Sequence, residues 1–327
     1  MIKFGIIGTS KITDEFIKSA SLLEDFKLNA VYSRTIEKAE KFASKYGVTN
    51  IFTDLEEMAK SNEIDAVYIA SPNLFHESQS ILFLNNKKHV LCEKPIASNR
   101  KSFNKMIEAS RNNKVLLMEA MKPTCVPNFQ VIKQQINNIG KVRKFSISFC
   151  QYSSRYDAFK EGKYTNAFNK DLSNGALADI GVNCIYPMVA LFGKPKEIKA
   201  NGVILPNSID GEGSILFKYD DFEGVVMYSK IANSYINSEI QGEDGSLIID
   251  KISSIQTVTL YLRNGEISDV STKQEYDPMY YEAKEFINLI KNKRKESSIN
   301  THKISMEVVE IMEEARKQLG IVYKDDK

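Results

Sequence analysis

The stretch I-K-F-G-I-I-G-T-S-K-I-T-D-E-F-I-K-S-A-S-L-L, residues 2–23, decides how the chain begins to fold. Residues 2–7 form a nearly continuous apolar run that ends at Gly8, a pattern typical of a buried parallel strand. After Gly8 the apolar residues recur at helical spacing, at positions 12, 16, 20 and 23. The stretch therefore predicts a strand that turns directly into a helix, whose free N–H groups favour a phosphate.

The turn itself is a degenerate dinucleotide-binding fingerprint. Of the pattern G-x-G-x-x-G only the first glycine is present, because Ser10 and Thr13 occupy the other two glycine positions. On these residues alone, the strand–turn–helix of an α/β domain without a nucleotide is an equally good interpretation. If a nucleotide binds, the residues expected to hold its phosphates are Gly8, Thr9, Ser10, Lys11 and Ile12.

Composition restricts the class of protein. The length of 327 residues favours two domains, and 43% hydrophobic with 26% charged residues is typical of a soluble globular chain. The 44 basic residues nearly balance the 42 acidic ones, so charge favours neither nucleic acid nor a membrane surface as a partner. Four scattered cysteines and three histidines disfavour a disulfide framework or a metal site. Because signal-peptide and membrane-span patterns are missing, we expect a cytoplasmic protein.

Strand and helix patterns alternate over the first 120 residues. Helices are expected after Thr35, after Thr53, and near 74–86 and 99–112. The further strands are expected at 28–32, near 51, and at 65–70, 90–92 and 115–118. This alternation predicts a doubly wound parallel sheet that binds ligands at the carboxyl ends of its strands. In that context dinucleotide binding becomes the favoured interpretation of the turn after Gly8.

The end of the second strand bears on the choice of cofactor. Domains that bind NAD usually place an acidic residue there to hold the ribose 2′-hydroxyl. This chain has Ser33 and Arg34 instead, with Lys38 one turn later. A small hydroxyl leaves room for a 2′-phosphate and a guanidinium pairs with one, although a solvated arginine at a strand end is also common. We therefore favour NADP(H), with NAD as the alternative.

From about residue 123 the pattern changes to successive strands. Helices are expected at 129–137, 279–291 and 302–319, and Asn264–Gly265 predicts a hairpin turn. The strands, which predict an antiparallel or mixed sheet, are expected at 142–152, 197–205, 213–219, 223–232, 235–241, 246–250 and 255–262. We therefore expect an α/β domain over residues 1–122 and an α+β domain over 123–327. One layer of helices cannot cover so much sheet, so we expect a bare face that pairs with a second copy, as a homodimer or a dimer of dimers.

Two groups of residues carry possible chemistry. Lys94, in Glu93–Lys94–Pro95, follows the fifth strand, and partial burial there would lower its pKa and let it exchange a proton with a substrate hydroxyl. Asp179, Asn183 and Tyr186 are spaced to share one face of a helix within residues 174–193, which suggests a polar stripe facing a cleft. A surface lysine in a turn and a solvated helix face are the alternatives.

Four motifs together resemble the Gfo/Idh/MocA oxidoreductases, the relatives of glucose-fructose oxidoreductase, inositol dehydrogenase and dihydrodiol dehydrogenase. They are Gly5–Ile6–Ile7–Gly8–Thr9, Ser71–Pro72–Asn73 with His76, Glu93–Lys94–Pro95, and Asp179 with Gly181. The resemblance covers nearly the whole chain. It implies a Rossmann domain and a second domain with a large open, mostly antiparallel sheet. It also implies hydride transfer between a nicotinamide cofactor and a sugar, polyol or related hydroxy or carbonyl compound.

The resemblance also implies roles for single residues. Lys94 matches the catalytic lysine of the family, and Asp179 matches its acidic residue on the substrate side. The cofactor-binding residues then include Ser71, Pro72, Asn73, His76, Glu93 and Lys94, and His76 shapes the loop near the nicotinamide rather than acting as a base. Asn183 departs from the family, which usually has histidine or tyrosine four residues after the aspartate. Because an amide neither gives up nor takes up a proton at neutral pH, Lys94 is the preferred proton carrier and the Tyr186 phenol is the second candidate.

Two functions stay open at this point. The first is an NADP(H)-dependent dehydrogenase or reductase acting on a small sugar-like compound, whose identity depends on loops such as 153–172. The second is a catalytically idle, cofactor-binding sensor of the same fold. Retention of Lys94 and Asp179 favours the enzyme, whereas Asn183 favours the sensor.

Overall fold

The computed structural model describes residues 1–163 and 165–326, which form two compact units. The first unit contains Met1–Ala120 and Tyr276–His302, and the second contains the rest of the chain. The first change of unit, after Ala120, lies close to the boundary expected at residue 122. Tyr276–His302, which we expected in the second domain, lies in the first unit, where its helix α10 (Pro278–Lys291) packs on α1 (Lys11–Ala20).

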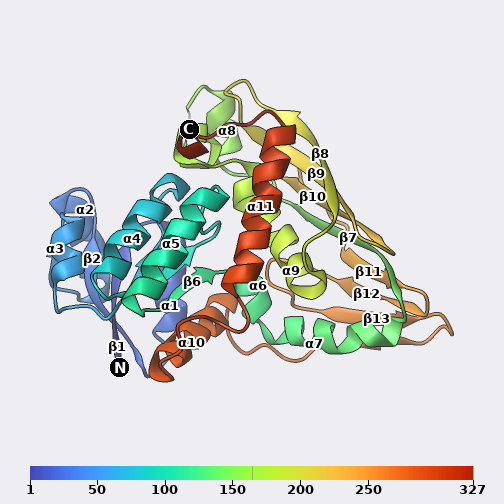
Figure 1. The fold of residues 1–327 in the computed structure, drawn as a ribbon, viewed down its shortest axis with the longest axis horizontal. Helices are drawn as coiled ribbons and strands as arrows, with labels where there is room; N and C mark the ends of the chain where they lie inside the picture. Colours follow the sequence, from blue (N-terminus) through green and yellow to red (C-terminus); the bar gives the residue numbers. More distant parts are fainter. Residues whose placement is uncertain (164, 327) are drawn as a thin grey trace. The chain divides into compact units, whose positions relative to one another are not determined.

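The first unit is built on a six-stranded parallel sheet with the strand order β3-β2-β1-β4-β5-β6. The order reverses between β1 and β4, and ligands of open α/β sheets bind beside this reversal. The predicted doubly wound fold is therefore confirmed (Figure 1). Its remaining elements are β1 (Ile2–Ile7), β2 (Phe26–Tyr32), α2 (Ile36–Ala43), β3 (Asn50–Phe52), α3 (Leu55–Lys60), β4 (Ala66–Ile69), α4 (His76–Asn85), β5 (His89–Glu93), α5 (Arg100–Asn113) and β6 (Leu117–Ala120).

Aromatic side chains hold β1 against the helices around it. The ring of Phe4 lies 6.2 Å from that of Phe16 on α1 and 5.8 Å from that of Phe286 on α10, between ring centroids. Phe16 in turn stacks on Tyr68 of β4 at 3.8 Å. Each of these rings is buried, and complete burial of a ring of this size contributes about 1.5–3 kcal/mol. The first strand is thus the centre of the first unit, as its apolar run predicts.

The second unit is built on an eight-stranded sheet with the order β14-β13-β12-β11-β7-β10-β9-β8. Among the described strands of this sheet, only β7 and β10 pair in parallel, so the predicted mostly antiparallel sheet is confirmed. The strands β13 and β14 are joined through Asn264–Gly265, the predicted hairpin turn. The elements are α6 (Lys122–Cys125), α7 (Pro127–Gln135), β7 (Val142–Cys150), α8 (Tyr156–Lys160), α9 (Val182–Phe192), β8 (Glu197–Ile204), β9 (Asp210–Lys218), β10 (Glu223–Ser229), β11 (Ser238–Gly242), β12 (Gly245–Ile249), β13 (Val258–Leu262), β14 (Ile267–Asp269) and α11 (His302–Gln318).

The two faces of the large sheet differ in what covers them. Side chains on one face, such as Phe145, Phe217 and Val226, are buried, and α9 packs against this face of β7 and β10. Alternate residues point the other way, and Leu216 and Tyr261 on that side are 55% and 43% exposed. Among the described helices of this unit, α9 and α11 lie on the same side of the sheet (Figure 1). We call the opposite side, which carries Leu216 and Tyr261, the outer face.

Candidate active site

The turn between β1 and α1 has the geometry of a phosphate cradle. Gly8 has φ +102°, and a Cβ atom added there would lie 2.5 Å from the carbonyl oxygen of Ala70, so only glycine fits. Ser10 is extended before the helix, and its side chain makes no capping hydrogen bond, which leaves the first N–H groups of α1 available to a ligand. Thr13 is fully buried, and its Oγ1 has no hydrogen-bond partner among the described residues. These observations fit a dinucleotide diphosphate at this turn, as does the exposed position of Lys11.

The cationic residues expected to select the cofactor lie at the end of β2. Ser33 is buried, and its N–H group donates a hydrogen bond to the carbonyl oxygen of Phe52 at the end of β3. Arg34 and Lys38 are both exposed on either side of the start of α2. No acidic side chain occupies positions 33–35, so a 2′-phosphate would meet a hydroxyl and a guanidinium there.

His76 connects the loops that follow β4 and β5. Its Nδ1 lies 2.9 Å from the carbonyl oxygen of Pro95, and its Nε2 lies 3.0 Å from that of Ser71. The ring is fully buried, and this burial lowers the pKa of His76, so the imidazole is neutral at pH 7 and donates to one of the two carbonyls. Each ring nitrogen therefore faces a backbone carbonyl oxygen. This geometry supports the predicted role of His76 in shaping the loop. Pro72 and Asn73, which precede it, are partly buried in a 3₁₀ turn.

The loop that carries Lys94 is held by buried carboxylates. Glu93 accepts hydrogen bonds from the Tyr68 hydroxyl and from the N–H group of Lys94 (3.2 Å). Burial and the nearby Glu93 raise the pKa of Tyr68 well above its usual value, so the phenol keeps its proton and donates it. Beyond the cis peptide between Lys94 and Pro95, the N–H group of Ile96 donates to Glu119 Oε1 at 3.0 Å. The backbone on both sides of Lys94 is thus fixed, and Lys94 itself is half-buried.

In the second unit, Asp179 is paired with a lysine that sequence reasoning missed. The Nζ atom of Lys230 lies 2.6 Å from Asp179 Oδ2 and 3.1 Å from the carbonyl oxygen of Ala167. Lys230 is 2% exposed, whereas the side chain of Asp179 is 37% exposed. A signal was present in the sequence, because Lys230 continues the alternation of the buried residues Val226 and Tyr228. Our predicted strand included it, but we assigned it no role.

The expected polar stripe on the helix does not form. The segment Leu177–Gly181 is a π-helical turn, and its wider i to i+5 spacing offsets the four-residue repeat before α9 begins. Asn183 is 5% exposed and its amide donates to the carbonyl oxygen of Asp179 at 3.1 Å. Tyr186 is fully buried, with its hydroxyl 3.0 Å from Ser305 Oγ on α11. The structure therefore places Asp179 and Asn183 together but turns Tyr186 into the packing of the second unit.

A buried aspartate and the C-terminal residues support this π-helical turn. Asp210 is fully buried, and its Oδ2 accepts a hydrogen bond from the N–H group of Leu177 at 2.5 Å. Its Oδ1 has no hydrogen-bond partner among the described residues, and burial raises the pKa of Asp210 to about 6. Just before the turn, Ser173 donates to Asp325 at 2.6 Å, and the Tyr323 hydroxyl donates to the carbonyl oxygen of Asn174 at 3.1 Å. Residues distant in sequence thus hold the segment that carries Asp179.

Within residues 1–163 and 165–326 no group of three or more His, Cys, Asp or Glu side chains could hold a metal ion. No helix in that part of the chain is long and apolar enough to cross a lipid bilayer. What the geometry does provide is a glycine turn at the switch point of a parallel sheet and a fixed lysine after β5. These features define the class of the protein, a nicotinamide-dinucleotide-dependent oxidoreductase of the α/β type.

Comparison with known proteins identifies the family. Residues 2–121 match the oxidoreductase family with the NAD-binding Rossmann fold, and residues 129–248 match the Gfo/Idh/MocA C-terminal domain. The chain belongs to the Gfo/Idh/MocA family, as its motifs predicted, and is an NAD(P)-dependent dehydrogenase of that family.

Several relatives match the chain over its whole length. It is 54% identical over 326 residues to scyllo-inositol 2-dehydrogenase (NADP(+)) IolU of Bacillus subtilis, covering 100% of this chain and 99% of that protein. It is 32% identical over 340 residues to trans-1,2-dihydrobenzene-1,2-diol dehydrogenase of Danio rerio, covering 99% of each. The crystal structure of aldose-aldose oxidoreductase from Caulobacter crescentus, with glycerol bound, superposes with a TM-score of 0.86 at 18% identity, covering 98% of this chain and 97% of that one. The last similarity concerns the fold alone.

Proposed function

We propose that the protein is an NADP(H)-dependent dehydrogenase that transfers a hydride between nicotinamide and a secondary hydroxyl carbon of a cyclic polyol or sugar. The observation that carries this proposal is the 54% identity along the whole chain to an NADP(+)-dependent scyllo-inositol 2-dehydrogenase. scyllo-Inositol is accordingly the first substrate to test. The 32% identity to a dihydrodiol dehydrogenase also supports a ring-shaped substrate with adjacent hydroxyl groups.

The first unit supports NADP(H) as the cofactor. Gly8, Thr9, Ser10, Lys11 and Ile12 would hold the diphosphate, because Gly8 leaves room for it and α1 begins there without a side-chain cap. The 2′-phosphate would lie beside the residues Ser33, Arg34 and Lys38. Around the nicotinamide end we propose the residues Ser71, Pro72, Asn73, His76, Glu93 and Lys94.

We assign the transfer of the alcohol proton to Lys94. The bound nicotinamide supplies the hydride acceptor or donor, and the alcohol proton must leave or return together with the hydride. Lys94 is the candidate that can carry a proton, because Tyr186 is fully buried against Ser305 and the Asn183 amide cannot titrate. In the second unit, Asp179 is proposed to orient a substrate hydroxyl as a hydrogen-bond acceptor, and Asn183 to fix the backbone at Asp179.

The assay is NADP(+) reduction followed by absorbance, with inositol isomers, aldoses and dihydrodiols as substrates and NAD(+) in parallel. We expect turnover with at least one cyclic polyol and a preference for NADP(+). Lys94→Ala should lower kcat by about 10³-fold or more without weakening NADPH binding to the same extent. If NADPH binds but no alcohol or ketone is turned over, the second candidate function, the idle sensor that Asn183 favours, replaces the first.

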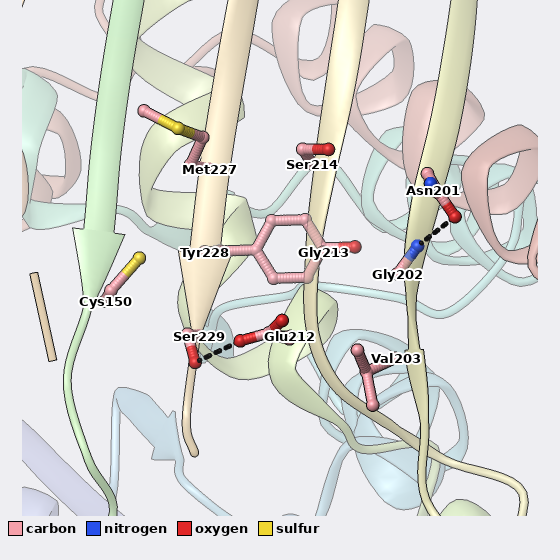
Figure 2. Close-up of a pocket in the computed structure, with 10 residues that line it drawn as sticks. All are labelled: Cys150, Asn201, Gly202, Val203, Glu212, Gly213, Ser214, Met227, Tyr228 and Ser229. Atoms are coloured by element: carbon pink, nitrogen blue, oxygen red, sulfur yellow. Dashed lines mark hydrogen bonds between the residues drawn. The ribbon is translucent and has the colours of Figure 1, made fainter. Parts of the chain in front are cut away.

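We also propose that the outer face of the large sheet pairs with a second copy in a homodimer or a dimer of dimers. Figure 2 shows a hollow in this sheet, with Cys150, Ser214 and Met227 on three of its strands. Gly202 and Gly213 are paired across β8 and β9 at this place, and a Cβ atom added at Gly213 would lie 2.4 Å from the Tyr228 hydroxyl. Exposed apolar residues such as Leu216 flank this region.

Sedimentation velocity tests the assembly. We expect a dimer or tetramer at micromolar concentration, and Leu216→Glu should shift it toward the monomer because a charge would be buried in the contact. A monomeric wild-type protein would rule the assembly out.

Cytoplasmic location is likewise a proposal, supported by four cysteines without a disulfide bond among them. Fluorescence microscopy or fractionation of the natural host checks it.

A further inference from the structure

We propose that Lys230 is a positioning residue that fixes the charge and orientation of the Asp179 carboxylate for the substrate. This inference rests on the proposed dehydrogenase function, in which Asp179 binds a substrate hydroxyl. It concerns the second unit alone, where the pair is formed between the end of β10 and the π-helical turn.

The ammonium group of Lys230 is held on several sides. It donates to Asp179 Oδ2 at 2.6 Å and to the carbonyl oxygen of Ala167 at 3.1 Å, and it lies 4.9 Å from the ring centroid of Phe168. Two directed hydrogen bonds and a cation–π contact leave a three-donor ammonium little freedom to rotate. At 2% exposure Lys230 is also shielded from the water that would otherwise weaken its attraction for Asp179.

The backbone at Lys230 is equally constrained. Its N–H group donates to the carbonyl oxygen of Gly211 at 2.9 Å, and its own carbonyl oxygen accepts from Ser153 at 2.9 Å. Directly before it, Ser229 Oγ accepts from the N–H groups of Ile231 and Ala232 at 3.2 and 3.0 Å. The backbone from which the lysine side chain extends is therefore fixed, and the ammonium holds the carboxylate from this fixed point.

The two partners differ in exposure, and this difference points to a ligand-directed role. Other ion pairs of the described chain include exposed ones, such as Lys141 and Asp221 at 50% and 53%, and largely buried ones, such as Arg316 and Asp326 at 2% and 20%. Here the cation is buried and the anion is 37% exposed. Burying a lone ammonium is costly, so Lys230 requires Asp179 as its counter-ion. The same pair holds the Asp179 carboxylate in one orientation at the surface, where another hydrogen-bonding group can reach it.

Two carboxylates interact electrostatically with Lys230. Asp179 is its direct partner, and the positive charge of Lys230 also lowers the pKa of the buried Asp210, against the larger opposite effect of burial. Replacing Lys230 by methionine removes the charge and keeps most of the side-chain length. Asp179 would then lose its fixed orientation and bind protons more tightly, so turnover should fall and its acidic limb should move to higher pH.

The experiment compares K230M, K230R, D179N and the double variant K230M/D179N with the wild type. The matched control is K141M, because Lys141 forms an exposed ion pair with Asp221 at the same distance of 2.6 Å. Melting temperature and NADPH affinity establish that each variant is folded. If K230M does not fold, K230Q, which can still donate to Ala167, takes its place. The assay is polyol-dependent NADP(+) reduction, from which kcat, KM and the pH profile are obtained.

We expect K230M to lower kcat by about tenfold or more, K230R to restore part of it, and K141M to leave it unchanged. NADPH affinity should stay within about twofold of the wild type in all of them. In the D179N background, adding K230M should cost no more than about twofold, because Lys230 acts through Asp179. An unchanged kcat in K230M would overturn this inference and leave the proposed function standing. The same holds if K230M lowers kcat as much in the D179N background as in the wild type. A wild type without turnover on any polyol overturns the proposed function and this inference with it.

Discussion

Replacing Asp210 by asparagine should stabilise the protein at neutral and alkaline pH and remove a pH-dependent part of its stability. Asp210 is fully buried, and its Oδ1 has no hydrogen-bond partner among the described residues. Its pKa is raised from 3.8 to about 6, by about two units, and at 1.36 kcal/mol per unit this corresponds to about 3 kcal/mol of unfolding free energy. Asparagine keeps an acceptor oxygen for the N–H group of Leu177 and carries no charge.

The direction in which stability changes with pH follows from proton binding. Because the pKa of Asp210 is higher in the folded protein than in the unfolded chain, folding takes up a proton in the window between these values. The contribution of the protonated Asp210 carboxyl to the free energy of unfolding is fully present below pH 3.8 and is lost as the pH rises through about 6. Between pH 5 and pH 8 this group should therefore cost the wild type about 1.4 kcal/mol. The advantage of Asp210→Asn over the wild type should grow by the same amount over that range.

Urea unfolding followed by circular dichroism, repeated between pH 5 and pH 8, measures this difference. Asp220→Asn is the matched control, because Asp220 is 70% exposed beside Lys196. The reasoning is refuted if the wild-type and Asp210→Asn stability curves run parallel across this pH range. It is also refuted if Asp210→Asn is less stable than the wild type at pH 8, since the buried charge would then be stabilising.

Three further changes test the first unit and the proton assignment. Gly8→Ala should destabilise the protein by about 3 kcal/mol and weaken NADPH binding, since its Cβ would lie 2.5 Å from the oxygen of Ala70; unchanged melting temperature and affinity would contradict this. Arg34→Ala should weaken NADPH binding by about 1.5–3 kcal/mol and leave NADH binding unchanged, as titration calorimetry would show; an equal loss for both cofactors counts against a 2′-phosphate contact. Tyr186→Phe should cost about 1 kcal/mol of stability and less than about tenfold in kcat, far less than Lys94→Ala; the opposite order in steady-state kinetics would make the phenol the proton carrier.

Local patterns predicted much of the fold because each depends on neighbouring residues. The apolar run before Gly8 and the helical spacing after it correspond to β1 and α1. The alternation in the second half likewise located seven of the eight strands of the large sheet, and Asn264–Gly265 located the turn that leads to β14, the strand it missed. Backbone sterics and side-chain period act over a few residues, so they can be read without knowing what packs on them.

The sequence by itself determined the alternation of strands and helices, the glycine that the first turn requires, and the motifs that identify the family. Only the tertiary structure decided that α10 packs in the first unit, that Tyr186 is buried against Ser305, and that Lys230 pairs with Asp179 from 51 residues away. These outcomes depend on which surfaces meet when strands pair and helices dock, and one π-helical turn is enough to change which side chains share a face. Spacing along the chain carries no information about partners that only packing brings together.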